Sequence, residues 1–81
     1  MKFRRTSRFD RSYGDAPATI QRAFDKQAAL LLQNLRHPSV RAKKYDESRD
    51  RRQARVTRDW RFYFPIEDDT YILQDIIRHP K

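Results

Sequence analysis

Large apolar side chains occupy every second position of residues 60–66, namely Trp60, Phe62, Phe64 and Ile66. The residues between them are Arg61, Tyr63 and Pro65. An alternation of period two is typical of a β-strand with one buried face, because successive side chains of a strand point to opposite faces. We therefore expect a strand here, in a sheet whose aromatic face is covered by other elements.

The first half of the chain has the apolar spacing of helices. One face of its longest helical segment carries residues three or four positions apart, namely Ile20, Phe24, Ala28, Leu31 and Leu35. This spacing predicts a helix with Asp15 as its N-cap, and Pro38 ends it because proline disfavours helical backbone in the residue before it. A shorter helix is expected between a Ser7 cap and Gly14, after a short strand over Lys2–Thr6.

The second half of the chain consists of short runs rich in β-branched and aromatic residues, separated by polar turns. Besides residues 60–66, these runs predict strands at Val40–Tyr45, Gln53–Thr57 and Thr70–Ile77, with a turn at Asp68-Asp69. Close connections between successive strands indicate an antiparallel meander. We expect an α+β fold in which an N-terminal helical hairpin packs on a small antiparallel sheet, with residues 1–81 forming one domain.

The predicted sheet has a second face, opposite the aromatic one, that collects cations and rings. Period-two geometry places the following residues there: Arg41, Lys43, Arg55, Arg61, Tyr63 and Tyr71. Arginine and lysine bind phosphate, and aromatic rings stack on bases, so this face is suited to a nucleic acid. The alternative is that these cations only form ion pairs with Asp59, Glu67 or Asp75.

The formal net charge of the chain is +8, and most of the excess lies in residues 36–61, which carry ten basic and four acidic side chains. A localised basic patch is typical of a protein that binds a polyanion, although a charged surface can also serve solubility alone. The chain has no cysteine, and its longest apolar run, Ala28–Leu32, is too short to span a membrane. We expect a cytoplasmic protein without a cofactor.

Common enzyme signatures are missing from the sequence. It contains no glycine-rich phosphate loop, no His-Glu-x-x-His motif and no Gly-x-Ser-x-Gly motif. Two histidines and no cysteine supply few ligands for a transition metal, so no metal site is expected. One reaction needs none of these parts: cleavage of RNA by its own 2′-hydroxyl requires only proton transfer and stabilisation of a charged phosphate.

The order of short motifs resembles the RelE/ParE superfamily, the toxins of bacterial type II toxin–antitoxin modules. The matching segments are residues 11–13, 20–26, 36–41, 54–64 and 75–80. The resemblance implies a compact α+β fold similar to that of small microbial ribonucleases. It also implies a cognate antitoxin as partner, and as target either mRNA on the ribosome, in the RelE-like branch, or DNA gyrase, in the ParE-like branch.

The resemblance also implies roles for individual residues. Arg61 falls where RNA-cleaving members place a phosphate-stabilising arginine, and His79 falls where several carry a general acid. Asp59 stands in an Asp-Trp pair found in some cleaving members, and either Asp59 or Lys43 is a candidate base. The residues expected to hold nucleic acid are Arg41, Lys44, Arg55, Arg58 and Tyr63.

Three functions remain open from the sequence. The first is an mRNA endoribonuclease that acts on the ribosome and is neutralised by an antitoxin. The second is a gyrase inhibitor, or a catalytically degenerate toxin that only binds its antitoxin, and the third is a plain nucleic-acid-binding module. The assembly is expected to be a homodimer or a hetero-oligomer with the antitoxin.

Overall fold

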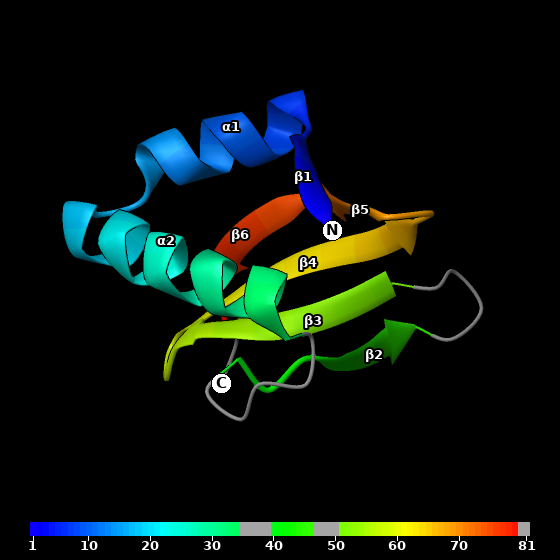
Figure 1. Ribbon diagram of the computed structural model, residues 1–81. Helices are drawn as coiled ribbons and strands as arrows, with labels where there is room; N and C mark the ends of the chain where they lie inside the picture. The colour runs from blue at the N-terminus through cyan, green and yellow to red at the C-terminus, as the bar shows by residue number, and fades with distance from the viewer. Residues whose placement is uncertain (35–39, 47–50, 80–81) are drawn as a thin grey trace.

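The computed structural model describes residues 1–34, 40–46 and 51–79, with the side chains of residues 44–46 excepted. These described residues form two helices and six strands (Figure 1). In chain order they are β1 (Lys2–Arg5), α1 (Ser7–Asp15), α2 (Ala18–Gln33), β2 (Lys43–Asp46), β3 (Arg51–Thr57), β4 (Trp60–Glu67), β5 (Thr70–Leu73) and β6 (Asp75–Arg78). The expected α+β class is confirmed.

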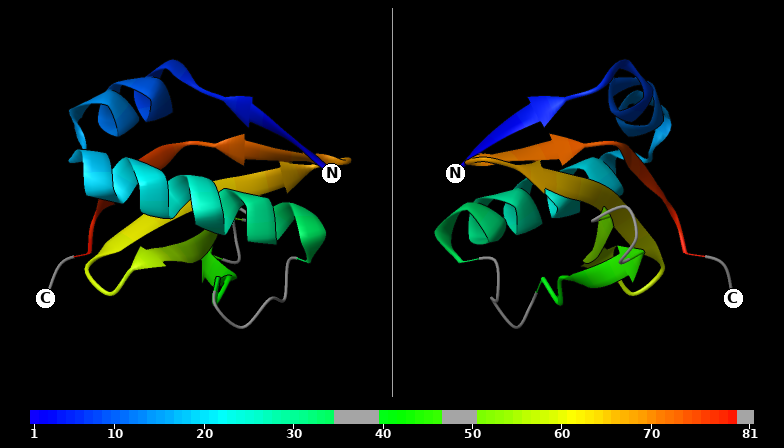
Figure 2. Two further views of the ribbon diagram at one scale, coloured as in Figure 1. Left: turned by 60° about the vertical axis from the view of Figure 1, so that its left-hand side comes forward. Right: turned by 90° about the vertical axis from the view of Figure 1, so that its right-hand side faces the viewer.

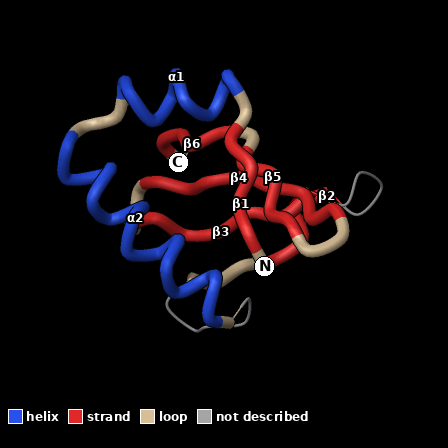
Figure 3. The backbone as a smooth tube through the Cα atoms, turned by 45° about the horizontal axis from the view of Figure 1, so that its top comes forward, coloured by secondary structure: helices blue, strands red, loops and turns tan. Residues whose placement is uncertain are grey.

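The strands form one sheet in the order β1-β5-β4-β3-β2, with β6 paired to β4. The pairs β2–β3, β3–β4 and β4–β5 are antiparallel, as expected. β1 pairs with β5 in parallel, which makes the sheet mixed. The two helices follow one another along one side of the strands (Figure 2). α1 contacts β6 and α2 contacts β3, an arrangement that is also visible in Figure 3.

The expected strand over Thr70–Ile77 is two strands, β5 and β6, separated by Gln74. The ladder pairs Tyr63 with Asp75 but Ile66 with Tyr71, so β5–β6 holds one residue more than β4 between these two pairs. One extra residue is a β-bulge, and it reverses the face to which the following side chains point. Pro65 of β4, which has no N–H to donate, lies beside this bulge.

The bulge overturns one expectation about the faces of this segment. Tyr71 and Leu73, each 2% exposed, point into the core. Ile76, beyond the bulge, also points into the core. Tyr71 was expected on the opposite face, where it would have been available to stack on a base. Its hydroxyl instead donates to the Leu31 carbonyl at 3.4 Å, and burial raises the pKa of Tyr71, partly offset by the charge of Arg52.

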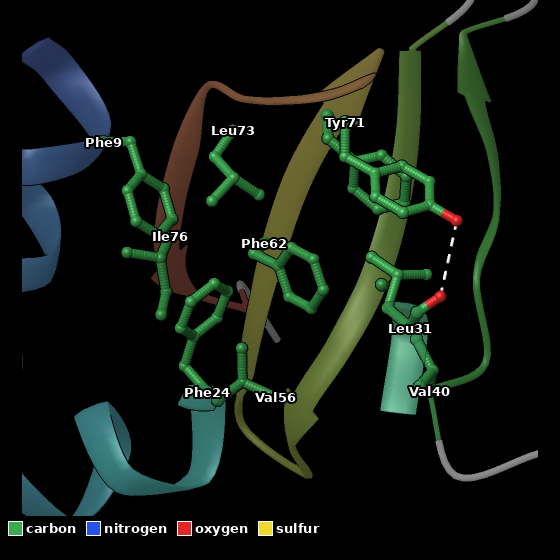
Figure 4. Close-up of a cluster of buried hydrophobic side chains, with 11 residues drawn as sticks. Phe9, Phe24, Leu31, Val40, Val56, Phe62, Tyr71, Leu73 and Ile76 are labelled. Atoms are coloured by element: carbon green, nitrogen blue, oxygen red, sulfur yellow. Dashed lines mark hydrogen bonds between the residues drawn. The ribbon is translucent and has the colours of Figure 1, made fainter. Parts of the chain in front are cut away.

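The core lies between the helices and the sheet. Phe62 of β4 is fully buried, and its ring meets that of Phe24 of α2 edge-on at 5.0 Å (Figure 4). The Phe64 ring stacks with the Phe62 ring at a centroid distance of 5.4 Å. The expectation that the aromatic face of residues 60–66 packs against the helices is correct. No helix among the described residues is long and apolar enough to cross a membrane.

The helix ends differ from those expected. Thr6, rather than Ser7, is the N-cap of α1, and Pro17, rather than Asp15, is the N-cap of α2. Gly14 lies inside α1, which ends one residue later and does not use a left-handed residue to stop. α2 ends at Gln33, and the expected stop before Pro38 lies outside the described residues.

Replacing Thr6 by alanine is expected to lower the free energy of unfolding by about 1–2 kcal/mol. The Thr6 hydroxyl accepts a hydrogen bond from the Phe9 amide at 3.1 Å and donates one to the Leu73 carbonyl at 2.8 Å, so it joins α1 to β5. Urea denaturation measures the change. Thr6→Ser keeps the hydroxyl, so its free energy of unfolding should fall by less than half as much as that of Thr6→Ala. An equal loss of stability in both variants would contradict the role of the hydroxyl.

Candidate functional site

The register of the ladders defines the sheet face turned away from the helices, which we call the open face. Residues directly opposite one another share a face, so two rows can be read across the strands. One row contains Arg55, Arg61 and Ile77, and the next contains Lys43, Gln53, Tyr63 and Asp75. Beside them Arg51 of β3 lies opposite Pro65. Among the side chains that the structure describes, these two rows and Arg51 supply four cations from three strands and the Asp75 carboxylate.

Arg55 and Arg61 lie directly opposite each other on β3 and β4, and both side chains are half-buried. Neither forms an ion pair with a carboxylate in the described part of the chain. Like charges in directly opposed cross-strand positions destabilise a sheet. A bound anion would relieve that repulsion, so this pair is a candidate site for phosphate.

The Arg61 guanidinium is held by the turn between β3 and β4. Its Nη1 donates to the carbonyls of Thr57 at 2.6 Å, Arg58 at 3.1 Å and Trp60 at 3.0 Å. Nε and Nη2 make no hydrogen bond to any described residue, and together they form the side-on fork that pairs with two oxygens of a phosphate. The contacts of Nη1 thus fix the direction of a fork that is available to a ligand.

Asp59 and His79 lie at the same end of the sheet as Arg61. The His79 amide donates to the Asp59 carbonyl at 2.6 Å, which extends the β4–β6 ladder by one pair. The alternation of β6 continues to His79 and puts it on the side of Ile77, which faces Arg61. His79 Nδ1 is buried and has no hydrogen-bond partner among the described residues. The structure therefore brings together three of the four residues expected to be catalytic.

Lys43, the fourth, is exposed and lies two strands from Arg61, opposite Gln53 in the neighbouring row. It shares the open face but not the turn at which the other three meet. Tyr63 stands between Gln53 and Asp75 in the same row and is only 9% exposed, so little of its ring is open to solvent.

The other expected binding residues are dispersed. Arg58 is exposed in the turn beside Arg61. Arg41 precedes β2, and its φ of 52° turns the chain away from the extended conformation, so the expectation that it lies in a strand is wrong. Lys44 lies opposite Arg52 in the β2–β3 ladder, and its side chain is outside the described part of the structure.

Two residues of this region were not expected from the sequence. Arg51 lies outside the strand expected over Gln53–Thr57, but it begins β3, and its alternation with Gln53 and Arg55 is the signal that indicates its face. Arg8 of α1 reaches the open face from the other half of the chain, and its Nε lies 3.0 Å from Asp75 Oδ2. The side chain of Asp75 is 13% exposed and that of Arg8 is 80% exposed, so a cation in solvent neutralises a largely buried carboxylate.

Within residues 1–34, 40–46 and 51–79, no group of three or more His, Asp and Glu side chains is arranged to hold a metal ion. The chemistry that the open face can supply comes from guanidinium groups, an imidazole and a carboxylate.

Comparisons with known proteins relate the chain to others through structure. A comparison with protein-family models finds no match, and one with curated proteins finds none either. Among solved structures, YafQ from Escherichia coli strain BL21(DE3) superposes with a TM-score of 0.77 at 17% identity, covering 94% of this chain and 90% of YafQ. A YoeB/ParE toxin from Agrobacterium tumefaciens gives a TM-score of 0.79 at 11% identity, covering 99% and 100%.

A third structure is that of the toxin–antitoxin complex RelBE2 from Mycobacterium tuberculosis. It gives a TM-score of 0.75 at 18% identity and covers 96% of each chain. All three likenesses extend over at least nine-tenths of both chains, so no large element is added or lost. The chain therefore has the RelE-like α+β fold of the RelE/ParE toxins, as its short motifs predicted.

Proposed function

We propose that this chain is the toxin of a type II toxin–antitoxin module and that it cleaves mRNA bound to the ribosome. The observation that carries the proposal is the cluster of Asp59, Arg61 and His79 beside Arg55, which forms no ion pair with a described carboxylate, on a fold shared with YafQ and RelE toxins. The cluster holds the three functions that metal-independent RNA cleavage needs: a base, an acid and a fixed cation.

In the proposed reaction, Asp59 removes the proton of a ribose 2′-hydroxyl, and the oxygen attacks the adjacent phosphorus. The Arg61 fork and Arg55 stabilise the negative charge that develops on the phosphoryl oxygens. The bond from phosphorus to the 5′-oxygen breaks, and His79 donates a proton to that oxygen. The products are a 2′,3′-cyclic phosphate and a 5′-hydroxyl. Asp59 is favoured over Lys43 as base because it lies in the turn just before Arg61 and its carbonyl accepts from the His79 amide, whereas Lys43 is two strands away.

The remaining cations are proposed to position the RNA. Lys43, Arg51 and Arg58 lie on or beside the open face, Arg41 precedes β2, and Lys44 lies within β2. The proposed protein partner is an antitoxin, as in the RelBE2 complex. A chain with a net charge of +8 is complementary to an acidic partner, which would compete with RNA for the same surface.

The test is cleavage of a reporter mRNA by the purified chain with and without ribosomes. Cuts should depend on ribosomes, and their ends should be 2′,3′-cyclic phosphates and 5′-hydroxyls. Primer extension locates the cuts, and end-specific ligation identifies the chemistry. Intact mRNA after incubation with ribosomes and an excess of folded protein would refute the proposal.

A second function is favoured by one observation, namely that three backbone carbonyls already accept hydrogen bonds from Arg61 Nη1. This contact fits a structural role for Arg61 in a non-catalytic protein that inhibits gyrase or only binds its antitoxin. Plasmid supercoiling by gyrase, measured beside the mRNA assay, distinguishes the two. Loss of supercoiling with intact mRNA would select this second function.

The ion pair between Arg8 and Asp75 gives a prediction about RNA affinity. Arg8→Gln leaves the largely buried Asp75 carboxylate without its cation, so RNA binding should weaken at least severalfold through repulsion of phosphate. Asp75→Asn, alone or in the Arg8→Gln background, should bind RNA at least as tightly as the unaltered chain. Fluorescence anisotropy with a single-stranded RNA at two salt concentrations measures both, and equal affinities in all four proteins would contradict the prediction.

A further inference from the structure

A cavity of about 450 Å³ opens beside the bulge at Gln74, where β6 meets the first turn of α1. Its lining includes Arg8, Arg51, Tyr63, Gln74, Asp75 and Ile77. Ile77 also lies directly opposite Arg61 in the β4–β6 ladder, so the cavity adjoins the proposed catalytic cluster. Its volume falls in the range of sites that hold small organic molecules.

Gln74 is the unusual residue of this cavity. Its backbone is fixed, because its N–H donates to the Tyr63 carbonyl at 2.9 Å and its carbonyl accepts from the Thr6 hydroxyl at 3.4 Å. Its side-chain Oε1 is nevertheless buried and has no hydrogen-bond partner among the described residues. A buried acceptor without a donor destabilises the folded state, so its presence needs a reason. Rotation of the side-chain amide into the cavity would let a ligand there donate a hydrogen bond to Oε1, which supplies such a reason.

The charges around the cavity indicate what else that ligand carries. Asp75 is neutralised by Arg8 at 3.0 Å. Arg51 is half-buried and forms no ion pair with a described carboxylate, so the balance of the lining is one unpaired positive charge. This arrangement favours a ligand with a single anionic group, for which phosphate is the natural partner of arginine.

The rest of the lining suits a flat, partly apolar group. Tyr63 contributes a ring, and Ile77 is 39% exposed, which is high for a large aliphatic side chain. A side-chain amide offers a donor and an acceptor side by side, and so does the edge of a nucleobase. Single-stranded RNA is recognised in this way, with a base against a ring and its edge read by hydrogen bonds.

We propose that the cavity is a nucleotide subsite that selects the residue next to the cleaved phosphate. Arg51 binds the phosphate of that nucleotide, Gln74 reads the edge of its base, and Tyr63 with Ile77 forms the wall against which the base packs. The subsite rests on the proposed ribonuclease function for its biological meaning. Its ligand binding, however, can be measured without ribosomes or mRNA.

The test is an NMR titration of the full ¹⁵N-labelled chain with each of the four ribonucleoside 5′-monophosphates. Inorganic phosphate and N-acetyl-aspartate serve as further probes. Saturable shifts are expected at the amides of Arg51, Tyr63 and Gln74, with affinities that differ between bases by at least about threefold. Phosphate alone should bind more weakly and act mainly at Arg51. Absence of saturable shifts, or equal binding of N-acetyl-aspartate and all nucleotides, would overturn the subsite, the latter indicating a site for an acidic protein side chain.

Two variants separate base reading from phosphate binding. Gln74→Met should abolish the preference among bases without lowering the urea midpoint, because it removes the unpartnered Oε1. Arg51→Gln should weaken all four nucleotides by about tenfold. The matched controls are Gln33→Met and Arg22→Gln, both on exposed positions of α2, which should leave binding unchanged. An unaltered base preference in Gln74→Met would overturn the role of Gln74.

These outcomes are distinguishable from failure of the proposed function. Nucleotide binding with the expected variant effects, in a protein that does not cut mRNA, would refute the ribonuclease and retain the subsite. Cleavage of mRNA in the absence of any nucleotide response at Arg51, Tyr63 and Gln74 would retain the ribonuclease and refute the subsite.

Discussion

Arg61→Ala is expected to lower the kcat of ribosome-dependent mRNA cleavage by about 10²- to 10³-fold, the usual cost of removing one group that stabilises transition-state charge. The physical reason is the position of its fork, which Nη1 fixes through three turn carbonyls while Nε and Nη2 bond to no described residue. Arg61→Lys keeps a positive charge but not a bidentate fork, so it should recover only part of the rate. Primer extension under single-turnover conditions measures kcat separately from RNA binding.

The controls for this variant address folding and charge. Because Arg61 also supports the β3–β4 turn, the urea midpoint of each variant must be measured, and rates compared where the protein is folded. Arg22→Ala removes one positive charge from an exposed position of α2 and should cleave at the unaltered rate. A wild-type rate in Arg61→Ala, or a loss fully explained by its unfolded fraction, would contradict the proposed role.

Phe62→Ala is expected to lower the free energy of unfolding by about 3–5 kcal/mol, the range observed for large aromatic residues in protein cores. Phe62 is fully buried, with the Phe24 ring edge-on at 5.0 Å and the Phe64 ring stacked at 5.4 Å. Its loss removes the contact between α2 and the centre of β4. Small domains have only about 5–15 kcal/mol of stability in total, so this variant should be close to unfolding at 37 °C.

Urea denaturation followed by circular dichroism measures the Phe62 effect. Leu32→Ala is the matched control, because Leu32 is a large apolar residue of α2 that is 43% exposed. Leu32→Ala should lower the free energy of unfolding by less than about 1 kcal/mol. If both variants lost the same stability, the aromatic cluster would not be the centre of the core.

Local patterns in the sequence were sufficient for much of the fold. The alternation of residues 60–66 and the helical spacing of Ile20, Phe24 and Leu31 depend only on neighbours in the chain, and both predicted the buried faces correctly. The segment 70–77 is the exception, since its bulge depends on pairing with β4. Pro65 was the available signal, because a proline inside a central strand indicates an interrupted ladder.

The sequence also indicated the neighbours in the candidate site. Asp59, Arg61 and His79 lie close in the fold because the β3–β4 turn and the end of β6 are side by side, while their catalytic roles stay a prediction. Arg8 carried no sequence signal of this kind. It reaches Asp75 across 67 positions of the chain, which only the packing of α1 against β6 brings about.

The amino-acid sequence by itself thus determined the α+β class, the buried faces of residues 60–66 and of α2, and the basic character of the open face, because these follow from spacings of two to four residues. Only the tertiary structure decided which charges are neutralised and where a ligand can enter. Arg8 cancels Asp75, Arg51 and Arg55 remain unpaired with any described carboxylate, and the bulge at Gln74 opens a cavity beside Arg61. The physical reason is that ion pairs and cavities depend on distances between segments remote in sequence, which are fixed when the sheet and helices pack together.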